Sequence, residues 1–267
     1  MENSLGKENI TRFLSQISLS YKDVIKFCND SYESRGIHLQ LSEQSPFKYY
    51  PLLKIDDKYW CYYPRLFSYF IVHAFYDLMK KADPGGFSSW FGGVMEKYIE
   101  KNITKLKIDF IPERKLKNIL GLNDPKVDFV INFSNFNILV ESKAVELAPL
   151  AIVNPDPVVF ENALEDSVTK AIMQTLFIRD KIEKREISGI NSDVSYIFIV
   201  SYKELFLGHG QGAWEEIFKD ATREFCNSRN IDQTKIDPSK IFFMSIADFD
   251  AFLRIISNKS ADEIKFT

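Results

Sequence analysis

The chain has 267 residues, of which 45% are hydrophobic and 27% are charged, and its formal net charge is −3. This composition is typical of a globular protein that forms one large domain or a domain with an extension. The absence of a net positive charge excludes a globally basic nucleic-acid-binding protein, so any such contact is expected to use a local patch or a partner.

The cysteines and the N-terminal residues predict a cytoplasmic protein. The three cysteines are scattered without CxxC spacing, which favours reduced thiols over a disulfide framework or a zinc site. No charged segment followed by an apolar stretch opens the sequence, so no secretory signal is expected. The longest apolar stretch, residues 66–79, is too short to span a bilayer, and no membrane contact is predicted.

Residues 1–82 are predicted to form an accessory region of helices and a β-hairpin. Apolar residues recur at helical spacing over residues 8–33. Residues 51–63 read as two short strands that turn at a pair of aspartates. A proline then opens a helix expected over residues 65–81, which a Pro-Gly-Gly segment ends.

Residues 83–267 are predicted to form the main domain, because apolar strands alternate there with helices. The elements are expected at residues 88–102 (helix), 106–111, 126–133 and 137–144 (strands), 160–184 (helix), 194–201 (strand), 214–228 (helix), 241–246 (strand) and from 248 onward (helix). Residues 113–126 are expected to be irregular, and residues 148–157 are expected to be a loop. The predicted fold class is α/β, with a central mixed β-sheet flanked by helices.

Two central strands of this domain direct charged residues to one point. A two-residue turn would pair Phe133 with Phe136. A longer loop, closed by a pair between Asn132 and Asn137, keeps the same register. In either case Asp128 falls directly opposite Glu141, with Cβ atoms roughly 5 Å apart. Lys143 lies two residues beyond Glu141 and therefore projects from the same face.

Two opposed carboxylates on strands this apolar need a compensating cation, because an unpaired buried charge is costly. Mg²⁺ is the expected cofactor, with Mn²⁺ as its substitute, since Mg²⁺ is commonly held by one or two carboxylates together with phosphates. The alternative is a solvated pair of carboxylates on an edge strand. For Lys143, the alternative is an ion pair with Glu141 or Glu146.

These residues resemble the motif of the PD-(D/E)xK nuclease superfamily, which has the restriction-endonuclease-like fold. The match consists of Val127-Asp128 followed by Glu141-Ser142-Lys143, and it is extended by Glu96 in the preceding helix and Gln174 in the following one. The resemblance covers residues 88–256 and leaves the N-terminal region outside it.

The sequence departs from the family pattern at two places. Val127 stands where the name-giving proline is expected, and Pro125 lies three residues before Asp128, which makes Asp124 a rival for the first carboxylate. Ile178 occupies the tyrosine position of the RecB-like signature, so that signature is incomplete here.

The resemblance implies a metal-dependent endonuclease that hydrolyses phosphodiester bonds, with DNA favoured over RNA, in a restriction, repair or phage-defence setting. It implies that Asp128, Glu141 and Glu96 are metal ligands. It also implies that Lys143 positions or deprotonates the attacking water and that Gln174 binds the substrate or the water.

Alternatives to these roles remain open at the level of sequence. Glu96 has the alternative of pairing with Lys97 or Lys101 on the helix surface, and Glu100 is a rival acid one turn on. Gln174 has the alternative of facing solvent.

Basic residues that flank the motif are candidates for phosphate contacts, although each one alone is more simply a solvated side chain. They are Lys101, Lys105, Lys107, Arg114, Lys115, Lys117, Arg179, Lys181, Lys184 and Arg185. Because the whole chain is acidic, a protein partner or a second copy of the chain is expected to contribute to nucleic-acid binding.

Two other functional classes remain open. The first is a catalytically inactive module on the same fold that binds nucleic acid or protein. The second is an unrelated α/β interaction protein, in which the motif is coincidental and Asp128 and Glu141 lie on different faces of the sheet.

Overall fold

The computed structural model describes residues 6–31, 46–147, 157–190, 194–257 and 263–264. The chain divides into two compact units, Met1–Phe87 and Ser88–Thr267, and the division falls within helix α5 (Pro84–Lys105). Most of the loop expected at residues 148–157 lies outside the described residues. Among the helices that the structure describes, none combines the length and the apolar character needed to cross a bilayer.

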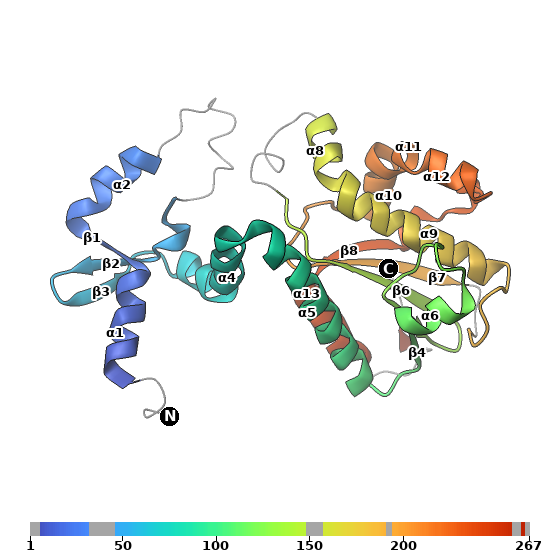
Figure 1. Ribbon diagram of the computed structural model, residues 1–267, viewed down its shortest axis with the longest axis horizontal. Helices are drawn as coiled ribbons and strands as arrows, with labels where there is room; N and C mark the ends of the chain where they lie inside the picture. The colour runs from blue at the N-terminus through green and yellow to red at the C-terminus, as the bar shows by residue number, and fades with distance from the viewer. Residues whose placement is uncertain (1–5, 32–45, 148–156, 191–193, 258–262, 265–267) are drawn as a thin grey trace. The chain divides into compact units, whose positions relative to one another are not determined.

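In its described residues, the first unit contains a three-stranded mixed sheet together with helices α1, α2 and α4 (Figure 1). Its elements are α1 (Gly6–Gln16), β1 (Ser18–Ser20), the 3₁₀ turn η1 (Tyr21–Asp23), α2 (Val24–Ser31), the 3₁₀ turn η2 (Pro46–Tyr49), β2 (Leu52–Ile55), β3 (Lys58–Cys61) and α4 (Pro64–Ala82). Strand β2 pairs in parallel with β1 and antiparallel with β3. The buried core of this unit comprises Ile17, Leu52 and Phe70.

The β2–β3 hairpin and the helix that follows it confirm the sequence prediction. The sequence predicts helical structure throughout residues 8–33; helices α1 and α2 form there, but β1 interrupts them. Ser18 and Ser20 pair with Leu52 and Lys54, so the chain there is extended by a partner more than thirty residues away in the sequence.

The second unit is built on a five-stranded sheet in the order β4-β5-β6-β7-β8. Its elements after α5 are β4 (Phe110–Pro112), α6 (Glu113–Ile119), β5 (Phe129–Asn132), β6 (Asn137–Lys143), α8 (Pro157–Leu164), the π-helical segment η3 (Glu165–Thr169), α9 (Lys170–Glu183), β7 (Ser195–Ser201), α10 (Gly210–Ala213), the π-helical segment η4 (Trp214–Phe218), α11 (Lys219–Ala221), α12 (Arg223–Ser228), β8 (Ile241–Ser245) and α13 (Ile246–Ile256). Strands β4, β5 and β6 are antiparallel, and β6, β7 and β8 are parallel. This is the α/β fold with a central mixed sheet that the sequence predicts.

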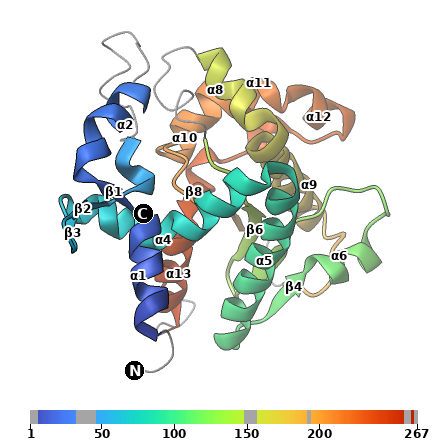
Figure 2. The same ribbon diagram turned by 60° about the vertical axis from the view of Figure 1, so that its left-hand side comes forward.

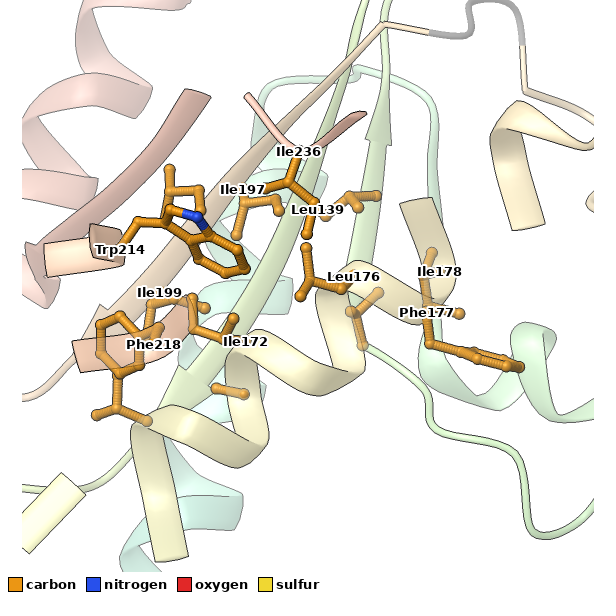
Figure 3. Close-up of a cluster of buried hydrophobic side chains, with 14 of the residues drawn as sticks. Leu139, Ile172, Leu176, Phe177, Ile178, Ile197, Ile199, Trp214, Phe218 and Ile236 are labelled. Atoms are coloured by element: carbon orange, nitrogen blue, oxygen red, sulfur yellow. The ribbon is translucent and has the colours of Figure 1, made fainter. Parts of the chain in front are cut away.

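Helices cover both faces of this sheet, and each face has its own core. Helices α5 and α13 pack on one face, where Ile99, Phe129 and Phe249 are fully buried (Figure 2). Helix α9 and the segment from α10 to α12 pack on the other face. Figure 3 shows Leu139 and Ile197 of the sheet against side chains from those helices. Helices therefore shield both faces of the sheet from solvent, as predicted from strands whose apolar residues do not alternate with polar ones.

Two expectations for this unit differ from the structure. The strand expected at residues 106–111 is displaced, because α5 extends to Lys105 and β4 covers Phe110–Pro112. Residues 113–126 are not irregular throughout, because α6 forms at their start and buries Leu116 completely. Helix α6 follows β4 directly, and the backbone N–H of Glu113 donates to the carbonyl of Asp128 at 2.8 Å. This contact fixes α6 beside the start of β5.

Candidate functional site

The β5–β6 hairpin has the predicted register. Phe129 pairs with Val140, and the backbone N–H of Phe133 donates to the carbonyl of Phe136 at 3.0 Å, which closes a two-residue turn. Continuing this pairing by one residue brings Asp128 opposite Glu141. The backbone N–H of Asp128 donates to Glu141 Oε2 at 3.1 Å, and the charge of Asp128 raises the pKa of Glu141, so the two acids are close neighbours.

Lys143 links the β6 carboxylate to helix α9. Its Nζ donates to Glu141 Oε1 at 2.7 Å and to Gln174 Oε1 at 3.2 Å. Gln174 Nε2 in turn donates to the carbonyl of Lys126 at 2.8 Å. The structure thus brings Gln174 into the same cluster as the motif residues. The ion pair with Glu141 that the sequence left open for Lys143 is present, whereas Glu146 pairs instead with Lys203.

Ser142, the variable residue between Glu141 and Lys143, fixes the Asp128 carboxylate. Asp128 Oδ2 accepts hydrogen bonds from the Ser142 backbone N–H at 2.8 Å and from its hydroxyl at 2.5 Å. Sequence reasoning missed this residue because it varies in the motif. The sequence did contain a signal for this contact, because Ser142 has a small hydroxyl side chain and directly follows Glu141, which was predicted to lie opposite Asp128.

Burial dominates the electrostatics of the two acids. It raises the pKa of the Asp128 carboxyl, and the hydrogen bonds from Ser142 and the charge of Lys143 oppose that rise. Burial and then the charge of Asp128 raise the pKa of Glu141 to about 8, although Lys143 lowers it. One ammonium therefore compensates two buried carboxyl groups incompletely, and an additional cation would be stabilised here.

Glu96 on α5 lies within electrostatic range of this pair. Burial raises the pKa of its carboxyl first, and the charge of Asp128 raises it next. Within the described part of the chain, Glu96 forms neither a hydrogen bond nor an ion pair, so the pairing with Lys97 or Lys101 is not observed. Its rival Glu100 is bound to Arg114 at 2.6 Å.

Helix α6 adds Glu113, which the sequence analysis did not assign to the site, and Lys117, which the sequence analysis named only as a candidate phosphate contact. Glu113 and Lys117 form an ion pair at 2.6 Å with i,i+4 spacing, which was a readable signal for this helix. The charge of Glu113 raises the pKa of Asp128. The pKa of Lys117 is also raised, chiefly by its hydrogen bond with Glu113 and to a smaller extent by the charges of Glu96 and Asp128.

Asp124, the rival for the first carboxylate, is engaged elsewhere. Its carboxylate accepts from the backbone N–H of Gly121 at 2.9 Å and from Arg229 at 3.1 Å. The neighbouring Lys126 is buried, and its Nζ donates to the carbonyls of Gly121, Leu122 and Asp124. Asp124 and Lys126 thus organise the loop before β5, and Asp128 is the acid that faces Glu141.

Many of the flanking basic residues are paired with acids. Arg179 contacts Glu183 at 3.0 Å, Lys181 contacts Glu186 at 2.6 Å, and Lys184 contacts Asp180 at 2.6 Å. Arg114 and Lys117 are paired as described above. Nucleic acid would have to compete with these carboxylates for the same cations.

The donor set of the site suits a hard divalent cation. It offers carboxylate oxygens from two adjacent residues, and Mg²⁺ usually takes one or two carboxylates and completes its shell with water or phosphate. Among the residues described by the structure, no group of three or more His, Cys, Asp or Glu side chains converges closely enough to hold a metal ion. Asp128 and Glu141 therefore fit such an ion as a two-carboxylate site, with Glu96 in the surroundings.

Comparisons of this chain with protein-family models, with curated proteins and with solved structures gave no match. The interpretation of the site therefore rests on the geometry and electrostatics described above.

Proposed function

We propose that the chain is a metal-dependent endonuclease that hydrolyses phosphodiester bonds, with DNA as the favoured substrate. The observation that carries the proposal is the convergence of Asp128, Glu141, Lys143 and Gln174, which come from three separate segments and are joined by direct hydrogen bonds. Two acids that can hold a metal ion, with a lysine beside them to stabilise developing negative charge, are groups that can promote phosphodiester hydrolysis. It also supports the resemblance to the PD-(D/E)xK nucleases.

Each residue has a proposed role that follows from its contacts. Asp128 and Glu141 would hold Mg²⁺ or Mn²⁺, and Glu96 would act on the ion through its nearby charge. A bound ion would lower the pKa of an attacking water and neutralise charge on the phosphoryl oxygens. The Lys143 ammonium orients the attacking water and stabilises negative charge in the transition state. Gln174 and Ser142 hold Lys143 and Asp128 in position.

The proposal is tested with a nicking assay on supercoiled plasmid in the presence of Mg²⁺ or Mn²⁺, with chelator as the blank. We expect Asp128→Asn and Lys143→Met to lower the cleavage rate by at least about a hundredfold, the lower end for loss of a catalytic acid–base group. Asp220→Asn and Lys219→Met on α11 are the matched controls, because both side chains are exposed and distant in sequence from the motif. Cleavage that survives both site substitutions would rule out this site.

The substrate class is tested in the same assay with single-stranded DNA, duplex DNA and RNA of one sequence. We expect cleavage of DNA to exceed that of RNA. Correctly folded protein that binds these oligonucleotides without cleaving any of them would favour the inactive binding module. The internal hydrogen bonds of the two acids, with Glu141 bound to Lys143 and Asp128 bound to Ser142, are the observation in favour of that alternative.

We further propose that a protein partner or a second copy of the chain supplies part of the duplex-binding surface. The reason is that Lys117, Lys181 and Lys184 are already paired with acids of the same chain. The isolated chain is therefore expected to bind duplex DNA weakly and with a shallow dependence on salt. Tight duplex binding with a steep salt dependence by the chain alone would contradict this.

A further inference from the structure

The first unit contains a cavity of about 340 Å³ that is separate from the site on the second unit. Its lining comes from α1, η2 with the residue that follows it, and α4. Ile17 and Phe70 belong to the buried core of the unit and form an apolar part of the lining. Phe13 and Leu78 also line it and are each 48% exposed, so the cavity is accessible from the surface.

Aromatic rings and ammonium groups meet at one wall of this cavity. Tyr49 and Tyr50 line it next to Lys81. The Nζ of Lys81 lies 5.3 Å from the centre of the Tyr49 ring, and the Nζ of Lys48 lies 4.7 Å from it. Two positive charges are thus gathered at the Tyr49 ring, and of the two lysines only Lys81 lines the cavity. Gln16 adds an amide to a lining that is otherwise apolar or aromatic.

The size and chemistry of the cavity restrict what it accepts. Its volume is within the range of roughly 300–1,000 Å³ that small-molecule sites occupy. An apolar aromatic wall favours a flat ring, because stacking on an aromatic side chain is tolerant of the identity of the base. The two ammonium groups favour an anion attached to that ring, since a lysine binds phosphate as a point charge.

We propose that this cavity binds one nucleotide unit, with the base against Tyr49 and the apolar lining and the phosphate at Lys81 and Lys48. The nucleotide is either free or part of a single strand, and both present the same base and phosphate. The inference does not depend on cleavage by the second unit. It gives the N-terminal region, to which the sequence assigned no chemistry, a binding role of its own.

The test measures binding by the full chain carrying Asp128→Asn in chelator, so that no cleavage interferes. The probe is a fluorescein-labelled thymidine oligomer of about ten nucleotides, followed by fluorescence anisotropy, and the competitors are dTMP, thymidine and inorganic phosphate. We expect Tyr49→Leu to weaken binding at least about fivefold, the lower end of the loss of one base stack. We expect Tyr49→Phe to retain binding, because it keeps the ring.

Lys81→Met tests the phosphate contact separately. Loss of one phosphate contact to a single strand lowers the slope of log affinity against log salt by about 0.7. Lys58→Met is the matched control, because Lys58 is an exposed lysine of the same unit that does not line the cavity, and it is expected to leave the slope unchanged.

The competitors distinguish the two sources of the nucleotide. Displacement of the probe by dTMP, more strongly than by thymidine or by phosphate, identifies a free nucleotide as sufficient. Binding of the oligomer that dTMP does not displace, but that still falls with Tyr49→Leu, identifies the single strand. The inference is overturned if Tyr49→Leu binds like the parent protein, or if Lys81→Met and Lys58→Met have the same salt slope. Neither of these two results bears on plasmid cleavage. The binding test of the cavity and the nicking assay of the proposed nuclease site can therefore fail independently.

Discussion

Lys143 has two roles in the folded chain. It takes part in the proposed chemistry, and its ammonium stabilises the buried carboxylate of Glu141. The Glu141 side chain is 3% exposed and the Lys143 side chain is 25% exposed, so the ion pair is mostly removed from water. Removing one partner of such a pair leaves a buried charge without compensation, which is more costly than removing both.

A double-mutant cycle tests this coupling. We expect Lys143→Met to lower the free energy of unfolding by roughly 2–3 kcal/mol at pH 8, because Glu141 then lacks its cation. The double variant Lys143→Met with Glu141→Gln is expected to recover most of that loss. Urea unfolding in chelator measures both values. Strictly additive effects of the two substitutions would show that the pair is not coupled.

Glu141 also predicts how stability depends on pH in the absence of metal. Its pKa in the folded chain is raised to about 8 from an ordinary value of 4.5. Between these two values the folded chain binds a proton that the unfolded chain has lost, so the free energy of unfolding falls as pH rises through this window. Below about 4.5 both states are protonated, and this dependence ends.

We expect the chelated protein to lose on the order of 2–4 kcal/mol through this group between pH 5 and pH 8, and Glu141→Gln to remove that loss. The measurement is urea unfolding at several pH values in chelator. Glu215→Gln is the control, because Glu215 is exposed and about half of its side chain is in water. The same pH slope in Glu141→Gln and in the parent protein would show that Glu141 is not the responsible group.

At the scale of single elements, α10 depends on one glycine. A Cβ added at Gly210 would lie 2.1 Å from the carbonyl oxygen of Ile241 and 2.6 Å from that of Pro238, and both are backbone atoms that side-chain rotation does not move. Close approach of α10 to the start of β8 therefore requires glycine at this position.

Gly210→Ala is expected to lower the free energy of unfolding by more than about 2 kcal/mol, because the backbone has to shift to admit the methyl group. Gly212→Ala, in the same helix, has nothing within 4 Å of its new Cβ and is expected to be neutral or to stabilise by up to about 1 kcal/mol. Thermal or urea unfolding of the two variants distinguishes them. Equal stabilities would mean that α10 does not approach β8 this closely.

The elements that the sequence predicted well are those set by local patterns. The register of β5 and β6 follows from two apolar runs and a short turn, and these are enough to place Asp128 opposite Glu141. The helix bearing Gln174 follows from a long helical pattern, and its position over the site came from the family resemblance. Local patterning therefore yielded most elements of the sheet domain and the opposition of Asp128 and Glu141, whereas Glu96 and Gln174 came from the family resemblance.

The elements that the sequence missed depend on partners far away in the chain. Strand β1 exists because it pairs with β2, although its own residues continue a helical pattern. Helix α6 exposes most of its charged residues and buries only Leu116, which gives little periodicity to read. The buried Lys126 is explained only by the three carbonyl groups around its ammonium, which the loop conformation brings together.

At the scale of the whole molecule, the two units differ in how much structure each contains. The second unit holds the five-stranded sheet and a core on each face, whereas the hydrophobic cluster described in the first unit is small and is built around Ile17, Leu52 and Phe70. All of the proposed catalytic residues lie in the second unit. A fragment of the second unit is therefore expected to fold without the first.

The fragment best begins at Asp83, because the Asp83 carboxylate accepts from the backbone N–H of Gly86 at 3.0 Å at the start of α5. In the full chain the rings of Phe87 and Tyr76 are in contact, with their centres 5.3 Å apart. The fragment lacks Tyr76, which exposes the Phe87 ring, so a second version of the fragment carries Phe87→Ser. We expect residues 83–267 to give a helical circular dichroism spectrum and a single cooperative urea transition. If the proposed function holds, the fragment cleaves plasmid, and it does not bind the oligonucleotide through the Tyr49 cavity, which it lacks. A fragment without a cooperative transition would show that the sheet and its two cores depend on the first 82 residues.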